Sequence, residues 1–245
     1  MKEIVIDAAA LPKLNVPAYQ LAIDEAALSM AEVGEIGTTF RTWELSSPTV
    51  ILGRSSKIEL ETDREFCRRR GIGIYRRCSG GAAIVAGPGC LMYNVIVSLD
   101  EHPEAAKIDR AHQLVMSRVL EAVKKQLPAA RKQGICDLTE GDRKFSGNAL
   151  RISRRHLLYH GTLLYDVDLE VLQRCLAFAP RQPDYRDGRD HGAFVTNVPL
   201  DPTLLRKDLA GEFGVDGQID ARDLIPAADK LIEQRYGREA WHTRH

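Results

Sequence analysis

The spacing of apolar and polar residues predicts several amphipathic helices along this chain. Segment 18–31 places Leu21, Ala22, Leu28 and Ala31 at helical intervals among acidic and polar residues, and the pattern stops near Gly34. Segment 108–127 is the longest stretch with helical character. The patterns at 59–70, 169–176, 203–213 and 221–236 predict further helices.

Between these helices, short runs rich in β-branched and aromatic residues predict strands. They cover 38–43, 49–52, 72–77, 82–86, 91–99, 134–139, 143–152 and 156–165. Glycine turns separate the runs from 72 to 99, a spacing that favours hairpins over parallel strands joined by helices. The sequence therefore predicts an α+β fold, with a mixed, mostly antiparallel sheet flanked by helices, as one domain over 1–245.

Composition narrows the classes of function. A hydrophobic content of 44% in 245 residues is enough for one sizeable core. Lys plus Arg and Asp plus Glu both number 34, so net charge gives no argument for nucleic acid or for an anionic membrane as a partner. No run resembles a signal peptide or a spanning helix, so we expect a cytoplasmic protein. The five scattered cysteines predict reduced thiols rather than a disulfide framework or a zinc site.

Two runs of small residues carry the candidate chemistry. Segment 76–83 reads Arg-Arg-Cys-Ser-Gly-Gly-Ala-Ala, and segment 144–149 reads Lys-Phe-Ser-Gly-Asn-Ala. Small side chains leave peptide N–H groups accessible, so a long, partly anionic ligand can approach the backbone, and Lys144 adds a point charge. We expect Gly80 and Gly81 to be needed for this approach. Taken singly, the glycines fit a bent hairpin and Lys144 fits a solvated strand face.

Two other segments have competing interpretations. His160 lies in the apolar run 157–164, where a core histidine with a satisfied hydrogen bond is the simpler interpretation than a general base. The adjacent Gly161 indicates close backbone approach. Segment 181–192 holds Arg186, Arg189 and His191 without apolar periodicity, which predicts an ordered loop or a mobile lid.

In this order, the runs resemble those of the lipoate-protein ligase and octanoyl/lipoyl transferase family, whose fold is related to that of biotin-protein ligases. The similarity covers about residues 15 to 241. It includes the 76–83 and 144–149 runs and His-Gly-Thr-Leu-Leu at 160–164. Shorter matches are Gly53-Arg54, Asp137-Leu138, Val195-Thr196-Asn197 and the ending Arg235-Tyr236 with Trp241.

The resemblance implies transfer of a lipoyl or octanoyl group to a lysine of a carrier domain, of the 2-oxoacid dehydrogenase E2 type or the glycine cleavage H protein type. It implies Lys144 as the catalytic residue that holds the acyl carbonyl, with no protein nucleophile. The implied substrate-binding residues are Arg54, Arg76, Arg77, Ser79, Gly80, Gly81, Ala82, Gly87, Gly89, Asn94, Asp137, Ser146, Gly147, Asn148, Ala149, His160, Gly161 and Thr162. ATP and Mg²⁺ are the implied cofactors, with Asp137 near the metal and Arg186, Arg189 and His191 as the adenylate loop.

Departures from the family pattern leave the reaction open. Many of the ligases have an aromatic-His-Asp sequence where this chain has Val85-Ala86-Gly87-Pro88-Gly89, closer to the octanoyltransferases. The chain has no room for the large accessory domain of many ligases, so a separate accessory chain is a further expected partner. Cys136 and Cys175 fall outside the positions of the transferase nucleophile. Three hypotheses follow, in this order: an ATP-dependent ligase, a cysteine-dependent transferase that uses carrier thioesters, and a non-catalytic binder.

Overall fold

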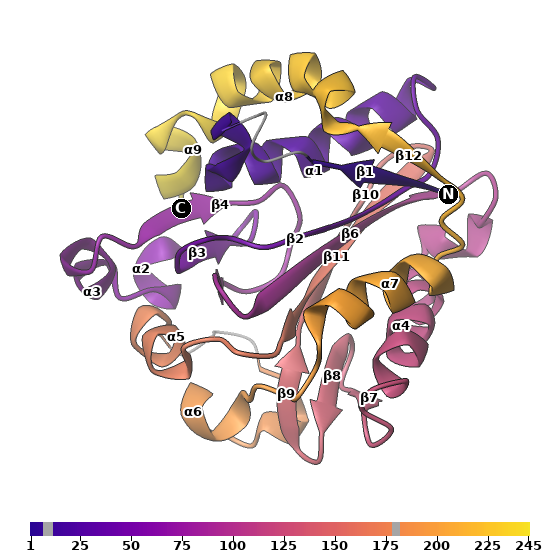
Figure 1. Ribbon diagram of the computed structural model, residues 1–245. Helices are drawn as coiled ribbons and strands as arrows, with labels where there is room; N and C mark the ends of the chain where they lie inside the picture. Colours follow the sequence, from indigo (N-terminus) through magenta and orange to yellow (C-terminus); the bar gives the residue numbers. More distant parts are fainter. Residues whose placement is uncertain (7–11, 178–181) are drawn as a thin grey trace.

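The computed structural model describes residues 1–6, 12–177 and 182–245, and a six-stranded sheet runs through its centre (Figure 1). The strand order is β10-β11-β6-β2-β1-β12. The strands are β1 (Lys2–Val5), β2 (Thr39–Trp43), β6 (Cys90–Ser98), β10 (Asn148–Ile152), β11 (His156–Leu164) and β12 (Gly217–Asp220). β1 is parallel to both of its neighbours, and the other pairs are antiparallel. The predicted α+β class is confirmed.

Helices cover both faces of this sheet, and β11 shows how. Successive side chains of a strand point to opposite faces. Tyr159 points to α4 (Ile108–Lys124), where its hydroxyl lies 2.8 Å from His112 Nδ1. The next residue, His160, faces Asp24 of α1 (Pro17–Glu32). α8 (Ile225–Leu231) packs on α1, and α7 (Pro202–Glu212) packs on α4. The site described below lies on the α1 face.

A second sheet has the order β4-β3-β5, with β3 (Thr49–Leu52) between β4 (Gly73–Arg76) and β5 (Ile84–Ala86). β3 and β4 are parallel and are joined through α2 (Ile58–Glu61) and α3 (Arg64–Arg69), whereas β5 is antiparallel to β3. The predicted hairpins across 72–99 are therefore wrong. The guanidinium of Arg77 donates to the carbonyls of Ile51, Gly80 and Ala82, so the chain bends around this side chain and reaches the far edge of β3.

A third sheet has the order β7-β8-β9, formed by β7 (Arg131–Gln133), β8 (Asp137–Glu140) and β9 (Arg143–Ser146). The sequence predicts one strand over 143–152, but Gly147 divides it between two sheets. β9 belongs to the small sheet, and β10 belongs to the central sheet. The run from Lys144 to Ala149 therefore bridges the two sheets.

The predicted helices at 59–70 and 221–236 exist as broken segments. Thr62 and Asp63 separate α2 from α3, and the Asp63 carboxylate accepts a hydrogen bond from Phe66 N at 2.8 Å, which caps the second helix. The later run comprises η4 (Ala221–Leu224), α8 and the π-helical turn η5 (Ile232–Tyr236), followed by α9 (Glu239–Thr243). The remaining short elements are η1 (Pro12–Asn15), η2 (Pro103–Ala106), α5 (Leu169–Cys175), η3 (Asp184–Arg186) and α6 (His191–Phe194).

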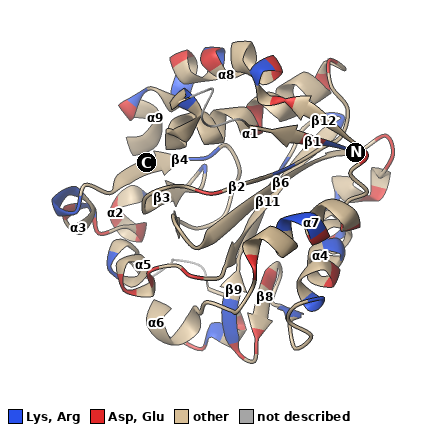
Figure 2. Cartoon of the chain, in the orientation of Figure 1, with Lys and Arg blue, Asp and Glu red and all other residues tan. Residues whose placement is uncertain are grey.

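Charged residues lie mainly on the outer helices and turns, and the central strands carry few (Figure 2). The buried apolar residues of the described ranges form one cluster. This cluster agrees with a single domain over 1–245, which stays a prediction. Among the described helices, none combines the length and the apolar character needed to cross a bilayer.

Candidate active site

A cavity of about 650 Å³ opens on the α1 face of the central sheet. Its inner end is formed by Leu21, Ile51 and Met92, which are at most 4% exposed. Its outer end includes Ile135, which is 73% exposed, and Tyr185. A cavity with mostly apolar lining residues and a few polar groups suits an apolar ligand with a reactive head.

Lys144 stands at the outer end, paired with a buried carboxylate. Its Nζ lies 2.8 Å from Asp137 Oδ1, with the two side chains 28% and 9% exposed. The Tyr185 hydroxyl donates to the other carboxylate oxygen of Asp137 at 2.7 Å. The backbone of Lys144 is fixed as well, because Thr196 N donates to its carbonyl at 2.9 Å and Val195 bridges to β9. Lys144 therefore presents a fixed cation to the cavity.

Two glycines bring backbone and side chains together beside Lys144. A Cβ on Gly147 would lie 3.0 Å from Lys144 Nζ, so the absence of a side chain at this position leaves room for the ammonium group. A Cβ on Gly161 would lie 1.8 Å from Asn148 Oδ1, inside any permissible contact. Asn148 in turn donates to the Cys136 carbonyl at 2.7 Å and accepts a hydrogen bond from Tyr93. These contacts hold β8 against β10 and shape the cavity wall.

The turn after β4 lies beside the cavity and is fixed by Arg77. Gly81 has a φ of +87°, which favours glycine, and it lines the cavity with Ala82 and Ala83. Ala83 N donates to Glu61 Oε2 at 2.8 Å. Within the described part of the chain, the N–H groups of Gly81 and Ala82 have no hydrogen-bond acceptor. Two adjacent unpaired N–H groups in such a turn can bind an anionic oxygen.

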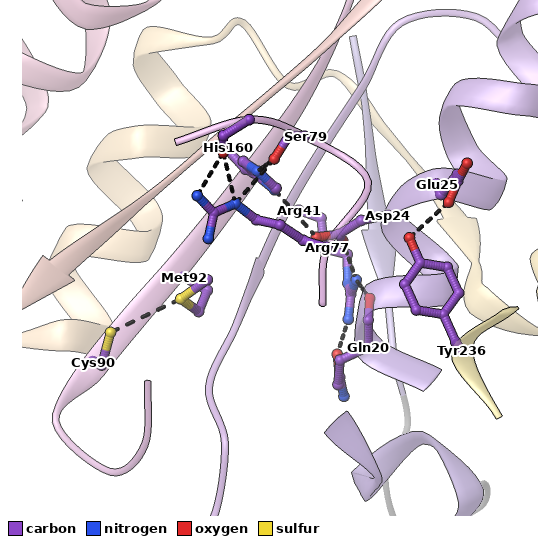
Figure 3. A network of polar contacts seen from close by, with 11 residues as sticks. Gln20, Asp24, Glu25, Arg41, Arg77, Ser79, Cys90, Met92, His160 and Tyr236 are labelled. Atoms are coloured by element: carbon purple, nitrogen blue, oxygen red, sulfur yellow. Dashed lines mark hydrogen bonds and ion pairs between the residues drawn. The ribbon is translucent and has the colours of Figure 1, made fainter. Parts of the chain in front are cut away.

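A buried chain of polar side chains lies beneath this turn (Figure 3). Arg77 Nε donates to Ser79 Oγ at 3.1 Å, and Ser79 Oγ lies 2.5 Å from His160 Nε2. His160 Nδ1 lies 3.9 Å from Asp24 Oδ2, and Asp24 pairs with Arg41 at 2.5 Å. Burial lowers the pKa of His160, and Arg77 lowers it further, against the opposing effect of Asp24. A neutral His160 therefore accepts the Ser79 hydroxyl proton as a hydrogen bond.

Cys136 lines the cavity but is a protonated thiol. Its Sγ lies 3.2 Å from the Asn148 carbonyl, to which it donates. Burial raises the pKa of Cys136, and Asp137 raises it further. Cys175 is fully buried in α5, away from the cavity lining. Neither thiol has the lowered pKa and the access that a nucleophilic cysteine requires.

The structure brings many of the predicted site residues together around the cavity. Those that line it are Arg77, Gly81, Ala82, Asp137, Lys144, Gly147, Asn148, Ala149, His160, Gly161 and Thr162. Ser79 and Ser146 are buried behind the lining, where Ser79 contacts His160 and Ser146 contacts Asn148. The sequence allows two interpretations of His160, a core histidine or a ligand contact. In the structure His160 is a buried, hydrogen-bonded histidine that also lines the cavity.

Other predicted contacts lie outside the lining, for identifiable reasons. Arg76 is fully buried, and backbone carbonyls surround its guanidinium. Asn94 is buried in β6, between Arg41 and His160 in the strand register. Gly87 packs on Pro48, and Gly89 packs on Asp166. Gly80 and Arg54 are exposed outside the cavity. None of these residues lines the cavity, and their contact with a ligand stays a prediction.

The side chains of the predicted adenylate loop contact neighbouring protein groups. Arg186 Nε donates to the Arg189 carbonyl at 2.8 Å, and Arg189 pairs with Asp142 at 3.0 Å. Both guanidinium groups lie over the Phe194 ring. Burial lowers the pKa of His191 to about 4, so that this ring is neutral. Residue 181 falls outside the described residues, and it is 182–185 that line the cavity.

The residues present do not fit a protein-built Mg²⁺ site. Both carboxylate oxygens of Asp137 are occupied, one by Lys144 and the other by Tyr185. Among the described residues, no group of three His, Cys, Asp or Glu side chains has the arrangement to hold a metal ion. We therefore derive no step through a metal, and a metal role for Asp137 stays a prediction.

Sequence reasoning missed the residues that close the two ends of the cavity. Leu21 and Met92 look like ordinary core positions in the helix and strand patterns, and only tertiary packing shows that they face the cavity. Tyr185 offered a weak signal, as the one aromatic residue in the polar run from 182 to 192. Its hydroxyl is the second partner of Asp137.

Comparison with known proteins agrees with this geometry. Residues 16–200 match the model of the lipoyl protein ligase A/B catalytic domain. The chain belongs to this family. It is 29% identical to an octanoyltransferase LipM of Geobacillus kaustophilus, over 64% of this chain and 64% of that protein. It is 22% identical to the LipM of Brevibacillus brevis, over 93% of this chain and 95% of that protein.

The family includes ligases as well as transferases. A lipoate-protein ligase A of Mycoplasma pneumoniae is 28% identical over 66% of this chain and 46% of that protein. The chain thus spans 64% and 46% of the lengths of the Geobacillus and Mycoplasma relatives. The names of these relatives thus include both an acyltransferase and a ligase.

Solved structures confirm the fold. A bipartite lipoate protein ligase from the archaeal lipoylation system of Thermoplasma acidophilum has a TM-score of 0.78 at 20% identity, over 98% of this chain and 94% of that chain. A lipoate-protein ligase A bound with ATP has a TM-score of 0.76 at 20% identity, over 99% of this chain and 98% of that chain. At this level of identity the likeness concerns the fold alone.

Proposed function

We propose that this protein transfers a lipoyl or octanoyl group from an acyl-adenylate, made with ATP, to a lysine of a lipoyl carrier domain. The observation that carries the proposal is the Lys144–Asp137 pair at the outer end of an apolar cavity, 2.8 Å apart. The family and the likeness to an ATP-bound ligase support it. The apolar inner end, with Leu21 and Met92, accommodates the acyl tail.

In this proposal the acceptor amine attacks the acyl carbonyl carbon, and the bond from that carbon to the phosphate oxygen breaks. AMP leaves as the amide forms, and the amine nitrogen gives up one proton to solvent. The Lys144 ammonium stabilises the negative charge on the carbonyl oxygen, a contact worth about 3 kcal/mol. The N–H groups of Gly81 and Ala82 are the available donors for an anionic oxygen at the other side. Asp137 and Tyr185 keep Lys144 in place, so that little reorganisation is needed during the reaction.

The alternative is transfer from a carrier thioester through a cysteine. The octanoyltransferase names among the relatives favour it, as does the presence of Cys136 in the cavity wall. The raised pKa of Cys136 argues against it, because the thiolate is the nucleophilic form. We therefore rank the ligase route first, because the Cys136 thiol is protonated.

Substituting the cysteines tests this ranking. We expect Cys136→Ser and Cys175→Ala to retain lipoyl transfer to a purified carrier domain within about threefold of wild type, because neither thiol supplies a nucleophile. The assay follows pyrophosphate release with lipoate or octanoate plus ATP, with and without the carrier domain. Mass spectrometry then looks for an acyl adduct on the enzyme after incubation with an octanoyl-carrier thioester. A stable adduct that disappears in Cys136→Ser would reverse the ranking.

A further inference from the structure

The segment from Tyr236 to His245 is bound tightly to Arg76, the last residue of β4, which directly precedes the substrate turn (residues 77–83). The backbone N–H of Arg76 donates to His242 Nδ1 at 2.9 Å. The Arg76 carbonyl accepts a hydrogen bond from Trp241 Nε1 at 2.9 Å. Both backbone groups of this one residue are thus satisfied by side chains more than 160 positions away in the sequence.

The Arg76 side chain extends the same connection. Its guanidinium donates to the carbonyls of His242 at 2.9 Å and Arg244 at 2.7 Å. On its other side it donates to the carbonyls of Gly53 at 2.8 Å and Ser56 at 2.7 Å. A fully buried cation with this many carbonyl acceptors is costly to disturb. Arg76 therefore joins the 236–245 segment to the loop after β3.

The segment has a second anchor on the opposite side. Glu25 of α1 is buried, and it accepts a hydrogen bond from the Tyr236 hydroxyl at 2.6 Å and pairs with Arg235 at 2.5 Å. The same carboxylate pairs with Arg151 of β10 at 2.6 Å. The segment is thus held between the helix and the strand that border the cavity, and its placement at Arg76 is fixed.

His242 has a defined proton arrangement in this connection. Its Nδ1 accepts the Arg76 N–H, so Nε2 carries the proton and donates to the Tyr236 carbonyl at 2.9 Å. Only the neutral ring can make both bonds, because protonation would place a second N–H against that of Arg76. The charged and titratable groups packed on the ring are Arg76 and Tyr75 of β4 and Tyr236 of η5.

We propose that the 236–245 segment is part of the acyl site and that His242 is its positioning residue, which fixes the start of the 77–83 turn through the backbone of Arg76. Arg77 follows directly, and its guanidinium holds the carbonyls of Gly80 and Ala82. A shift of residue 76 would therefore move Gly81 and Ala82, which line the cavity. No atom of His242 belongs to the cavity lining, so its effect is transmitted and not direct.

Two substitutions of His242 separate its two hydrogen bonds. In His242→Asn, the amide oxygen takes the place of Nδ1 and keeps the acceptor for Arg76. In His242→Gln, the amide nitrogen takes the place of Nε2 and keeps only the donor to Tyr236. Both variants lose the ring, so packing is affected alike. We expect His242→Gln to lower the transfer rate at least tenfold and His242→Asn to stay within threefold. Glu233→Gln is the control, because Glu233 is an exposed residue of η5 outside the 236–245 segment.

Amide hydrogen exchange gives a readout that does not depend on the proposed function. We expect faster exchange across 76–83 in His242→Gln than in His242→Asn, with or without acyl transfer. Equal exchange in the two variants would overturn the positioning role. If wild type shows no transfer while the exchange difference is present, the proposed function fails and the positioning role stands.

The pH dependence adds a second arm to the test. Burial lowers the pKa of His242, so the folded protein favours the neutral ring. The stabilisation is complete above the ordinary histidine pKa of about 6.5 and is lost as the pH falls below it. Between pH 6.5 and 5, we expect the exchange of 76–83, divided by the intrinsic rate of each amide at the same pH, to rise more in wild type than in His242→Asn, whose amide does not titrate. The same rise in both would overturn the assignment, because the other buried histidines are common to both proteins.

Discussion

Replacing Lys144 by alanine is expected to lower the rate of acyl transfer by about 100-fold or more. The ammonium is the fixed cation nearest to where the acyl carbonyl oxygen develops charge, and removing one such donor typically costs a factor of 10² to 10³. We also expect a lowered melting temperature, because Asp137 is buried and keeps only the Tyr185 hydroxyl of these two partners in the variant. The measurement is single-turnover transfer from a synthetic octanoyl-adenylate to a carrier domain.

Two further variants separate charge from packing. Lys144→Met keeps most of the aliphatic stem and removes the charge, so it should lose as much activity as alanine does. Lys132→Ala removes an exposed lysine of the neighbouring strand β7 and should leave the rate unchanged. If Lys144→Ala keeps more than about a tenth of the wild-type rate, a loss below 1.4 kcal/mol, Lys144 does not stabilise the reacting oxygen.

The sequence predicted cavity-lining residues best where a single short run contains several of them. Lys144, Gly147 and Ala149 lie in one run of six residues, and all of them line the cavity. Gly161 and Thr162 follow His160 directly in β11 and line it as well. The apolar pattern also located α1 and α4. Only α4 shows the expected amphipathic face, because residues 20 to 28 of α1 are all buried.

The connections between strands could not be predicted from the sequence. The hairpin prediction for 72–99 failed because local glycine turns do not reveal that β3 lies between β4 and β5. The Arg77 guanidinium contributes to this strand order, because it donates to the carbonyl of Ile51 in β3 and to that of Ala82 in the turn before β5. The division of 143–152 at Gly147 likewise depends on two sheets meeting there.

Residues with long side chains were misjudged for a related reason. The sequence places Arg76 and Arg77 side by side and gives them one role, but their side chains leave the strand on opposite faces. Arg77 borders the cavity, and Arg76 joins β4 to the 236–245 segment. Which of two adjacent arginines meets a ligand depends on the face of the strand that the cavity occupies, and that face is set by elements distant in the sequence.

The second large effect is expected from Gly53→Ala. Gly53 follows β3 and lies against the substrate turn, where an added Cβ would be 1.8 Å from the Gly81 carbonyl oxygen and 3.1 Å from Ser56 Oγ. Because the obstacle is backbone, the turn must move by more than 1 Å to admit the methyl group, and misplacement of this size can cost about 100-fold in rate. We expect a loss of about that size in acyl transfer, together with a lowered melting temperature.

Gly80→Ala is the matched control, since it adds the same methyl group to the turn itself. A Cβ on Gly80 would have no described atom within 4 Å, and its φ does not fall in the left-handed region. We therefore expect transfer within about threefold of wild type and an unchanged melting temperature. If Gly80→Ala were as damaging as Gly53→Ala, the turn would be sensitive to any added side chain, as expected where the ligand itself covers Gly80. If Gly53→Ala were as active as wild type, the close contact between Gly53 and the Gly81 carbonyl would not be needed for the site, and the turn would have room to adjust.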